Sequence, residues 1–106
     1  MRTIISSTGN RLDSRFDLRF GRAGWFCLFD EETGDISFVE NEFKNEIQGA
    51  GRKVVEKVVG LGADKVISGD FGPKAKDLLN RFNIQMIILP DEDQTIEHII
   101  SKLKKE

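Results

Sequence analysis

The sequence has few of the residues on which most small catalytic and metal sites depend. It contains one cysteine, one histidine and no tyrosine in 106 residues. A single cysteine excludes an internal disulfide and a cysteine-rich zinc site. Cys27 and His98 belong to separate predicted elements, and neither has a partner for a serine–histidine–aspartate or cysteine–histidine arrangement. The sequence therefore offers no nucleophilic arrangement of these two kinds.

Long apolar runs and an excess of charge of one sign are also missing. No run is long enough to span a bilayer, and the opening "MRTIISSTG" lacks the apolar core and cleavage site of a signal peptide. We therefore expect a cytoplasmic protein with no membrane partner. The net charge of −2 gives no general tendency to bind nucleic acid. The length predicts one domain, residues 1–106. We expect a monomer or weak homodimer.

The pattern of apolar residues predicts the element order β-β-β-α-β-α-β-α. Strands show alternation or short buried runs, whereas helices show apolar residues every three or four positions. Ile47 is the first residue of the apolar stripe assigned to the first helix. The predicted strands are residues 2–7, 24–30, 35–40, 65–69 and 85–90, and the predicted helices are residues 46–60, 73–82 and 94–104.

This element order predicts an α/β fold with a five-stranded mixed sheet in the order 3-2-1-4-5. The first three strands form an antiparallel meander, so strand 2 is antiparallel, and the later strands are parallel because helices join them. Right-handed crossovers place the first two helices on one face, which leaves the third for the other. The first and fourth strands then form a topological switch point, where open α/β sheets tend to bind ligands.

The segment "RFDLRFGRA", residues 15–23, follows the first strand and reaches this edge. Four of the seven arginines lie within twelve residues around it. We expect Phe20 to anchor the loop and Gly21 to supply a backbone geometry that other residues resist. Arg19 and Arg22 would then be fixed in place, which suits a multiply charged anion. The alternative is that the arginines form solvated ion pairs, such as Arg11–Asp13 and Arg15–Asp17.

The segment "GDFGPK", residues 69–74, follows the fourth strand and reaches the same edge. Its glycines allow close approach of a ligand, and a helix that begins at Pro73 presents unpaired N–H groups. The alternative is an ordinary strand-to-helix turn. One carboxylate, Asp70, cannot build a two-metal nuclease site. No catalytic residue or metal ligand is predicted, and the predicted ligand-binding residues are Arg19, Phe20, Gly21, Arg22, Gly69, Asp70, Gly72 and Lys74.

Several short motifs are distributed along most of the chain: "IISSTG", "LDSRFDLRFGRA", "FVEN", "GAG", "GAD" and "SGDFGPKA". Together they resemble the dinitrogenase iron-molybdenum cofactor biosynthesis family, most specifically at residues 19–23 and 72–75. The resemblance covers Ile4 to about Ile88. It implies a ribonuclease H-like motif and a non-enzymatic carrier of an anionic iron-sulfur or iron-molybdenum cluster precursor, bound transiently. It also implies a cluster-assembly or acceptor protein as partner.

Two other classes of function stay open at the level of the sequence. One is an interaction module that docks on a metalloprotein through an exposed patch of Phe16, Phe20 and Phe43. The other is a nucleotide or phosphometabolite binder that uses Lys74 and the helix N–H groups. For the remaining reactive side chains, Cys27 is predicted to be a buried core thiol and His98 a solvated side chain.

Overall fold

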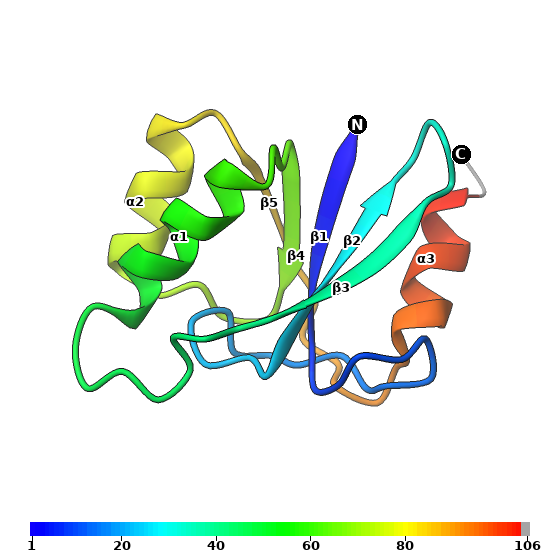
Figure 1. Ribbon diagram of the computed structural model, residues 1–106, viewed down its shortest axis with the longest axis horizontal. Helices are drawn as coiled ribbons and strands as arrows, with labels where there is room; N and C mark the ends of the chain where they lie inside the picture. The colour runs from blue at the N-terminus through cyan, green and yellow to red at the C-terminus, as the bar shows by residue number, and fades with distance from the viewer. Residues whose placement is uncertain (105–106) are drawn as a thin grey trace.

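The computed structural model describes residues 1–104 and contains a five-stranded mixed sheet with helices on both sides (Figure 1). The strand order is β3-β2-β1-β4-β5. Strand β2 is antiparallel to both of its neighbours, whereas β1, β4 and β5 are mutually parallel. The predicted class, strand order and strand directions are therefore confirmed. The elements are β1 (Arg2–Ser7), β2 (Trp25–Asp30), β3 (Ile36–Glu40), α1 (Ala50–Gly60), β4 (Lys65–Ser68), α2 (Pro73–Arg81), β5 (Gln85–Ile88) and α3 (Ile96–Lys104).

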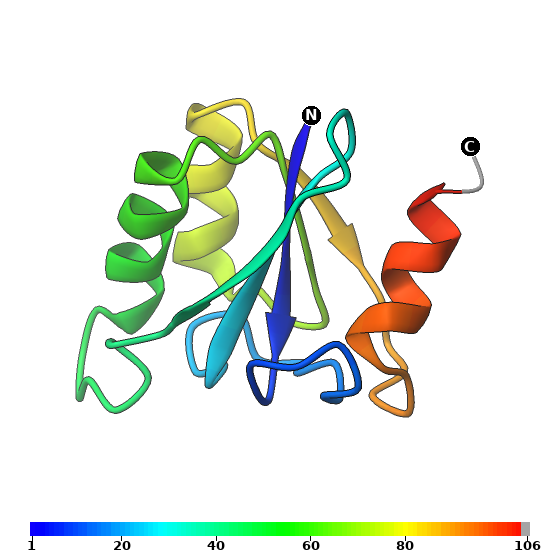
Figure 2. The ribbon, with the colours of Figure 1, turned by 45° about the vertical axis from the view of Figure 1, so that its right-hand side comes forward.

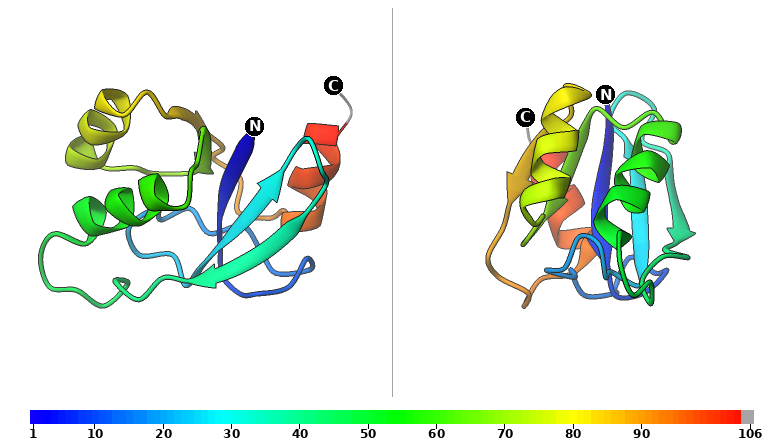
Figure 3. Two further views of the ribbon diagram at one scale, coloured as in Figure 1. Left: turned by 45° about the horizontal axis from the view of Figure 1, so that its top comes forward. Right: turned by 90° about the vertical axis from the view of Figure 1, so that its left-hand side faces the viewer.

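Two apolar cores lie on opposite faces of the sheet. Successive side chains of a strand point to opposite faces, so Ile4 packs beneath α1 and α2 while Ile5 packs beneath α3. Figures 2 and 3 show α1 and α2 side by side, with α3 across the sheet from them. The predicted placement of the helices is confirmed. No helix within residues 1–104 has both the length and the apolar character needed to cross a membrane.

The first helix begins later than its apolar pattern predicts. It starts at Ala50 rather than at Glu46, because Gly49 has a left-handed backbone (φ 76°) that interrupts helical geometry. Residues 41–49, the β3–α1 loop, precede it. Ile47 belongs to this loop and is 93% exposed, so its assignment to the helix core was wrong. The helical spacing of Ile47 alone therefore did not establish that the helix extends back over residues 46–49.

The long loop between β1 and β2 crosses the carboxyl edge of the sheet. Phe16 is buried in the core beneath α3, and Phe20 is buried in the core beneath α1 and α2. The backbone N–H of Phe16 donates to the carbonyl of Gln94 (2.8 Å), and that of Phe20 donates to the carbonyl of Asp70 (3.1 Å). The loop is thus fastened to both cores, as the prediction of a phenylalanine anchor requires.

Candidate functional site

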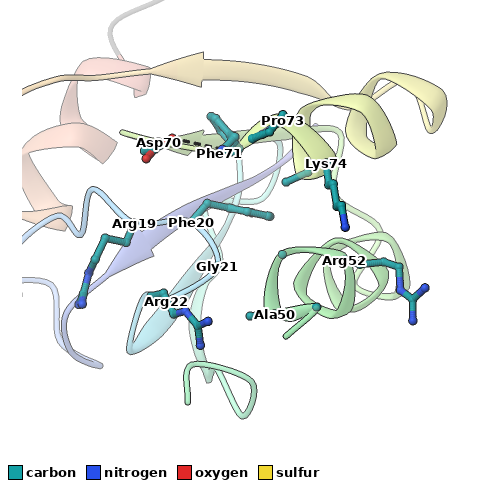
Figure 4. A pocket seen from close by; sticks show the side chains of 14 residues that line it. Arg19, Phe20, Gly21, Arg22, Ala50, Arg52, Asp70, Phe71, Pro73 and Lys74 are labelled. Carbon is teal, nitrogen blue, oxygen red and sulfur yellow. Dashed lines mark hydrogen bonds between the residues drawn. The ribbon is translucent and has the colours of Figure 1, made fainter. Parts of the chain in front are cut away.

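The β1–β2 loop and the β4–α2 turn lie side by side, although about fifty residues separate them in the sequence. Arg19 and Asp70 form an isolated parallel β-bridge. The backbone N–H of Gly69 donates to the carbonyl of Leu18 (3.1 Å). The two most unusual segments of the sequence therefore meet at the switch point between β1 and β4, as the topology predicted (Figure 4).

A pocket of about 550 Å³ opens between this loop and the first turns of α1 and α2. We call it the helix-start pocket. Seven of the eight predicted ligand-binding residues line it, and Gly69 does not. Sequence reasoning missed the contribution of α1, although the two glycines of "GAG", residues 49–51 near the start of the predicted helix, were an available signal. The lining residues are Arg19, Phe20, Gly21, Arg22, Gly49, Ala50, Gly51, Arg52, Asp70, Phe71, Gly72, Pro73, Lys74 and Ala75.

Both helices present backbone N–H groups to the pocket without a capping side chain. Their N-caps are Gly49 and Gly72, each with positive φ, and neither helix has an acidic residue in its first turn. Within residues 1–104 no acceptor is found for five backbone N–H groups, those of Ala50, Gly51, Arg52, Lys74 and Ala75. Unpaired N–H groups and the positive ends of two helix dipoles favour a negatively charged ligand.

The floor of the pocket is apolar, and the charged residues of its rim are cationic except for the exposed Asp70. Phe20 and Phe71 are buried, and their ring centroids are 5.1 Å apart. Arg52 and Lys74 are exposed at the mouth, and neither has an ion-pair partner within residues 1–104. An apolar floor beneath such a rim suits an anion that is large and weakly hydrated.

Arg19 is fixed by a carboxylate and points away from the helix starts (Figure 4). Its Nε and Nη2 donate to Oδ1 and Oδ2 of Asp17, each at 3.1 Å. The hydrogen bond and the negative charge of Asp17 raise the pKa of the Arg19 guanidinium. The alternative pairing of Arg15 with Asp17 is not formed, because Arg15 pairs with Asp93 at 2.8 Å. The alternative solvated pair of Arg11 and Asp13 is present.

Arg22 lies between the helix-start pocket and the β3–α1 loop. Its Nη1 donates to the carbonyl of Lys44 (2.9 Å) and to the carbonyl of Glu46. The Glu46 carboxylate in turn contacts Lys53 of α1. Arg22 is therefore held in place as predicted, but by backbone carbonyls of a loop that the sequence had not singled out.

Gly21 and Gly69 differ from the backbone roles that the sequence predicted for them. Gly21 does not have positive φ, so the expectation of an unusual backbone was wrong. A Cβ at Gly21 would lie 3.4 Å from the backbone nitrogen of Gly51, which is ordinary van der Waals contact, so Gly21 lies against the first turn of α1 without a steric need for glycine. A Cβ at Gly69 would lie 2.6 Å from Cδ2 of Leu18, so Gly69 accommodates the loop and not a ligand.

The remaining candidate residues do not contribute to this pocket. Cys27 is buried, and its burial raises the pKa of the thiol to about 12. His98 is exposed on α3. Both predictions are confirmed. Within residues 1–104 no group of three or more histidine, cysteine, aspartate or glutamate side chains could hold a metal ion. The pocket lining offers neither thiolate nor imidazole.

The exposed aromatic patch considered above does not exist. Phe16 and Phe20 are 1% and 0% exposed. Phe43 is partly buried and packs against the core beneath α1 and α2. This removes the surface on which the docking hypothesis rested.

The fold and this pocket define a class of small α/β domains that have a cationic, apolar-floored pocket at the carboxyl edge of the sheet. The chain belongs to a known family. The model of the family described as "Dinitrogenase iron-molybdenum cofactor" matches residues 1–106. The resemblance inferred from the short motifs is thus confirmed over the whole chain.

The chain is also similar to solved structures and to one further sequence relative. The apo form of the orange protein from Desulfovibrio gigas superposes with a TM-score of 0.90 at 28% identity, covering 98% of this chain and 87% of that one. A putative NifB protein from Thermotoga superposes with a TM-score of 0.83 at 30% identity, again covering 98% of this chain and 87% of that one. An uncharacterized protein of Methanocaldococcus jannaschii is 26% identical over 77 residues, which is 70% of this chain but only 65% of that relative.

Proposed function

We propose that this protein is a non-enzymatic carrier that binds an anionic metal–sulfur cluster, or its precursor, in the helix-start pocket. The observation that carries the proposal is the convergence of two uncapped helix N-termini on one pocket. Membership of a family described by the iron-molybdenum cofactor supports a metal–sulfur ligand over other anions. The proposed partners are a protein that assembles the cluster and a protein that accepts it.

The chemistry of the lining favours a sulfide-covered anion over a phosphate. Sulfide surfaces are large, polarisable and weakly hydrated, so contact with Phe20 and Phe71 costs them less desolvation than it costs a phosphate. Backbone N–H groups act as donors to sulfur without supplying a metal ligand. Because the lining lacks cysteine and histidine, the cluster would be held by its own charge and surface. Such a site releases its ligand intact, which a carrier requires.

The absence of thiolate ligation also sets the expected affinity. A single charge-assisted hydrogen bond contributes about 1.5–3 kcal/mol. Five such N–H groups and two rim cations cannot contribute additively, because each also loses its hydration on binding. We therefore expect reversible binding that is weakened by salt, in contrast to the tight, thiolate-ligated clusters of electron-transfer proteins.

Anaerobic titration with tetrathiomolybdate, a sulfide-covered molybdenum dianion, tests the proposal. Bound probe is measured by gel filtration in buffer that contains tetrathiomolybdate, with visible absorbance as the readout, and the amide signals of Ala50, Gly51, Arg52, Lys74 and Ala75 are followed by NMR. We expect retained colour and shifts at these five amides. Molybdate, which has the same charge but an oxide surface, is the matched control and should compete poorly for these amides.

Two outcomes would contradict the proposal. One is a folded apo protein that retains no tetrathiomolybdate. The other is displacement of the probe by ADP at equal concentration, which would favour the nucleotide or phosphometabolite alternative. That alternative uses the same N–H groups and Lys74, but it requires the pocket to prefer hard phosphate oxygens.

A further inference from the structure

A second cavity, of about 320 Å³, lies beside the helix-start pocket and shares Arg19 and Arg22 with it. We call it the arginine cavity. Its character is different, because no aromatic or long aliphatic side chain lines it. The residues that line it are Thr8, Asp17, Arg19, Arg22, Gly24, Lys44 and Asn45.

The cationic side chains of the arginine cavity outnumber its one carboxylate. Asp17 is only 4% exposed, and both of its carboxylate oxygens accept hydrogen bonds from Arg19. The backbone N–H of Arg19 donates to Asp17 Oδ1 as well (3.0 Å). Asp17 is therefore fully occupied in neutralising and orienting Arg19. Within residues 1–104, neither Arg22 nor Lys44 has a carboxylate partner.

Each cation keeps donors available after its internal contacts are made. Arg19 uses Nε and Nη2 on Asp17, which leaves Nη1. Arg22 uses Nη1 on the β3–α1 loop, which leaves Nε and Nη2. The described side chains give no acceptor for Lys44 Nζ. Guanidinium groups fixed in this way match pairs of oxygen atoms on a tetrahedral anion.

We propose that the arginine cavity is a second binding site, for a small tetrahedral oxygen dianion of the sulfate, phosphate or molybdate class. The polar lining favours a hard, well-hydrated anion, whereas the apolar floor of the helix-start pocket favours a soft one. The proposal is independent of what the helix-start pocket binds. The two sites share Arg19 and Arg22, so occupancy of one affects the electrostatic potential at the other.

A matched pair of lysine variants separates the two sites. Lys44 lines only the arginine cavity and Lys74 lines only the helix-start pocket. Neither lysine has an ion-pair partner within residues 1–104, so Lys44→Gln and Lys74→Gln remove the same charge with little effect on folding. Sulfate and molybdate are titrated into each protein at constant ionic strength, and binding is followed by NMR at the backbone amides of Gly24 and Asn45 and at the Arg22 Nε–H.

We expect saturable shifts at these three positions with both anions. Lys44→Gln should weaken sulfate binding about tenfold, which corresponds to the loss of one charge-assisted contact. Lys74→Gln should change it less than about twofold, because salt screens the more distant charge. Chloride at equal ionic strength should not produce these shifts.

Three results would overturn the proposal: equal weakening by both variants, sulfate-induced shifts at the Ala50 and Ala75 amides in place of those at Gly24 and Asn45, or no saturation. The result for the arginine cavity can be distinguished from the result for the proposed cluster-binding function. Sulfate binding sensitive to Lys44→Gln supports the arginine cavity even if tetrathiomolybdate is not retained. Retention of tetrathiomolybdate without sulfate binding supports only the helix-start pocket.

Discussion

Three helices begin at the same edge of the sheet, but they differ in whether their first backbone N–H groups have hydrogen-bond acceptors. At α3, the backbone N–H of Ile96 donates to the carbonyl of Ser14 (3.0 Å) and that of Glu97 to the carbonyl of Leu12 (2.9 Å). The backbone N–H of His98 donates to Oγ1 of Thr95 (3.1 Å). At α1 and α2, the N-caps are glycines, and no side chain of residues 1–104 caps either helix.

The difference shows that the unpaired N–H groups are a property of one face of the sheet and not of the fold in general. The β1–β2 loop closes the start of α3 with its own carbonyl groups. The same loop then crosses the edge and buries Phe20, but within residues 1–104 none of its carbonyl groups accepts a hydrogen bond from the first turns of α1 and α2. One face is sealed by the chain itself, while the other leaves five donors facing a cavity.

The sealed face can be tested through Cys27, which lies in the core beneath α3. A pKa raised from 9.0 to about 12 keeps the thiol protonated at neutral and mildly alkaline pH. Because the thiolate is the nucleophile, native alkylation should be at least about a thousandfold slower than in denaturant. Mass spectrometry of iodoacetamide time courses at pH 8 measures this ratio. Rapid native labelling would mean that the face beneath α3 opens.

The anchor that ties the loop to the open face is Phe20. The side chain is 0% exposed and packs against Phe26 and Phe71. Phe20→Ala should lower the free energy of unfolding by about 3–5 kcal/mol. Phe82→Ala, at a position that is 52% exposed, is the matched control and should cost far less. Urea denaturation compares the two, and similar losses would show that the loop is not held through Phe20.

The starts of α2 and α3 also differ in charge, because the first turn of α3 contains Glu97 and that of α2 has no acidic residue. A substitution in α2 can remove this difference. Lys74→Glu places a carboxylate beside the N–H groups of α2, where it should stabilise the helix by about 0.3–1 kcal/mol. The same carboxylate replaces a rim cation, so tetrathiomolybdate should bind at least about tenfold more weakly.

A matched control for this charge reversal exists in the last turn of α3, far from the pocket. Lys102→Glu makes the same change in net charge, and it should leave probe binding nearly unaffected. Gel filtration with absorbance readout compares both variants with the unaltered protein. If both reversals weaken binding equally, the ligand responds to net charge and not to the start of α2.

Sequence patterns predicted the sheet because strand alternation and connection lengths leave few topologies. They also brought together Arg19, Arg22, Asp70 and Lys74, since the carboxyl ends of β1 and β4 must be neighbours. They could not place the start of α1, because a left-handed Gly49 and a loop held by Arg22 depend on tertiary contacts. The same limit explains why the sequence assigned Gly69 to the ligand. The residue that Gly69 accommodates, Leu18, is fifty-one residues away in the sequence.

The capped helix gives the smallest and most selective prediction. Thr95→Ala removes the hydroxyl that accepts a hydrogen bond from the N–H of His98. The free energy of unfolding should therefore fall by about 1 kcal/mol. Thr95→Ser keeps the hydroxyl and should retain most of that stability. Neither variant should alter tetrathiomolybdate binding, because the start of α3 faces the β1–β2 loop and not the pocket. Thermal denaturation and the probe titration are measured on the same samples. A loss of binding with Thr95→Ala would mean that the two faces are coupled through the loop, since Ser14 and Phe20 belong to one continuous segment of chain.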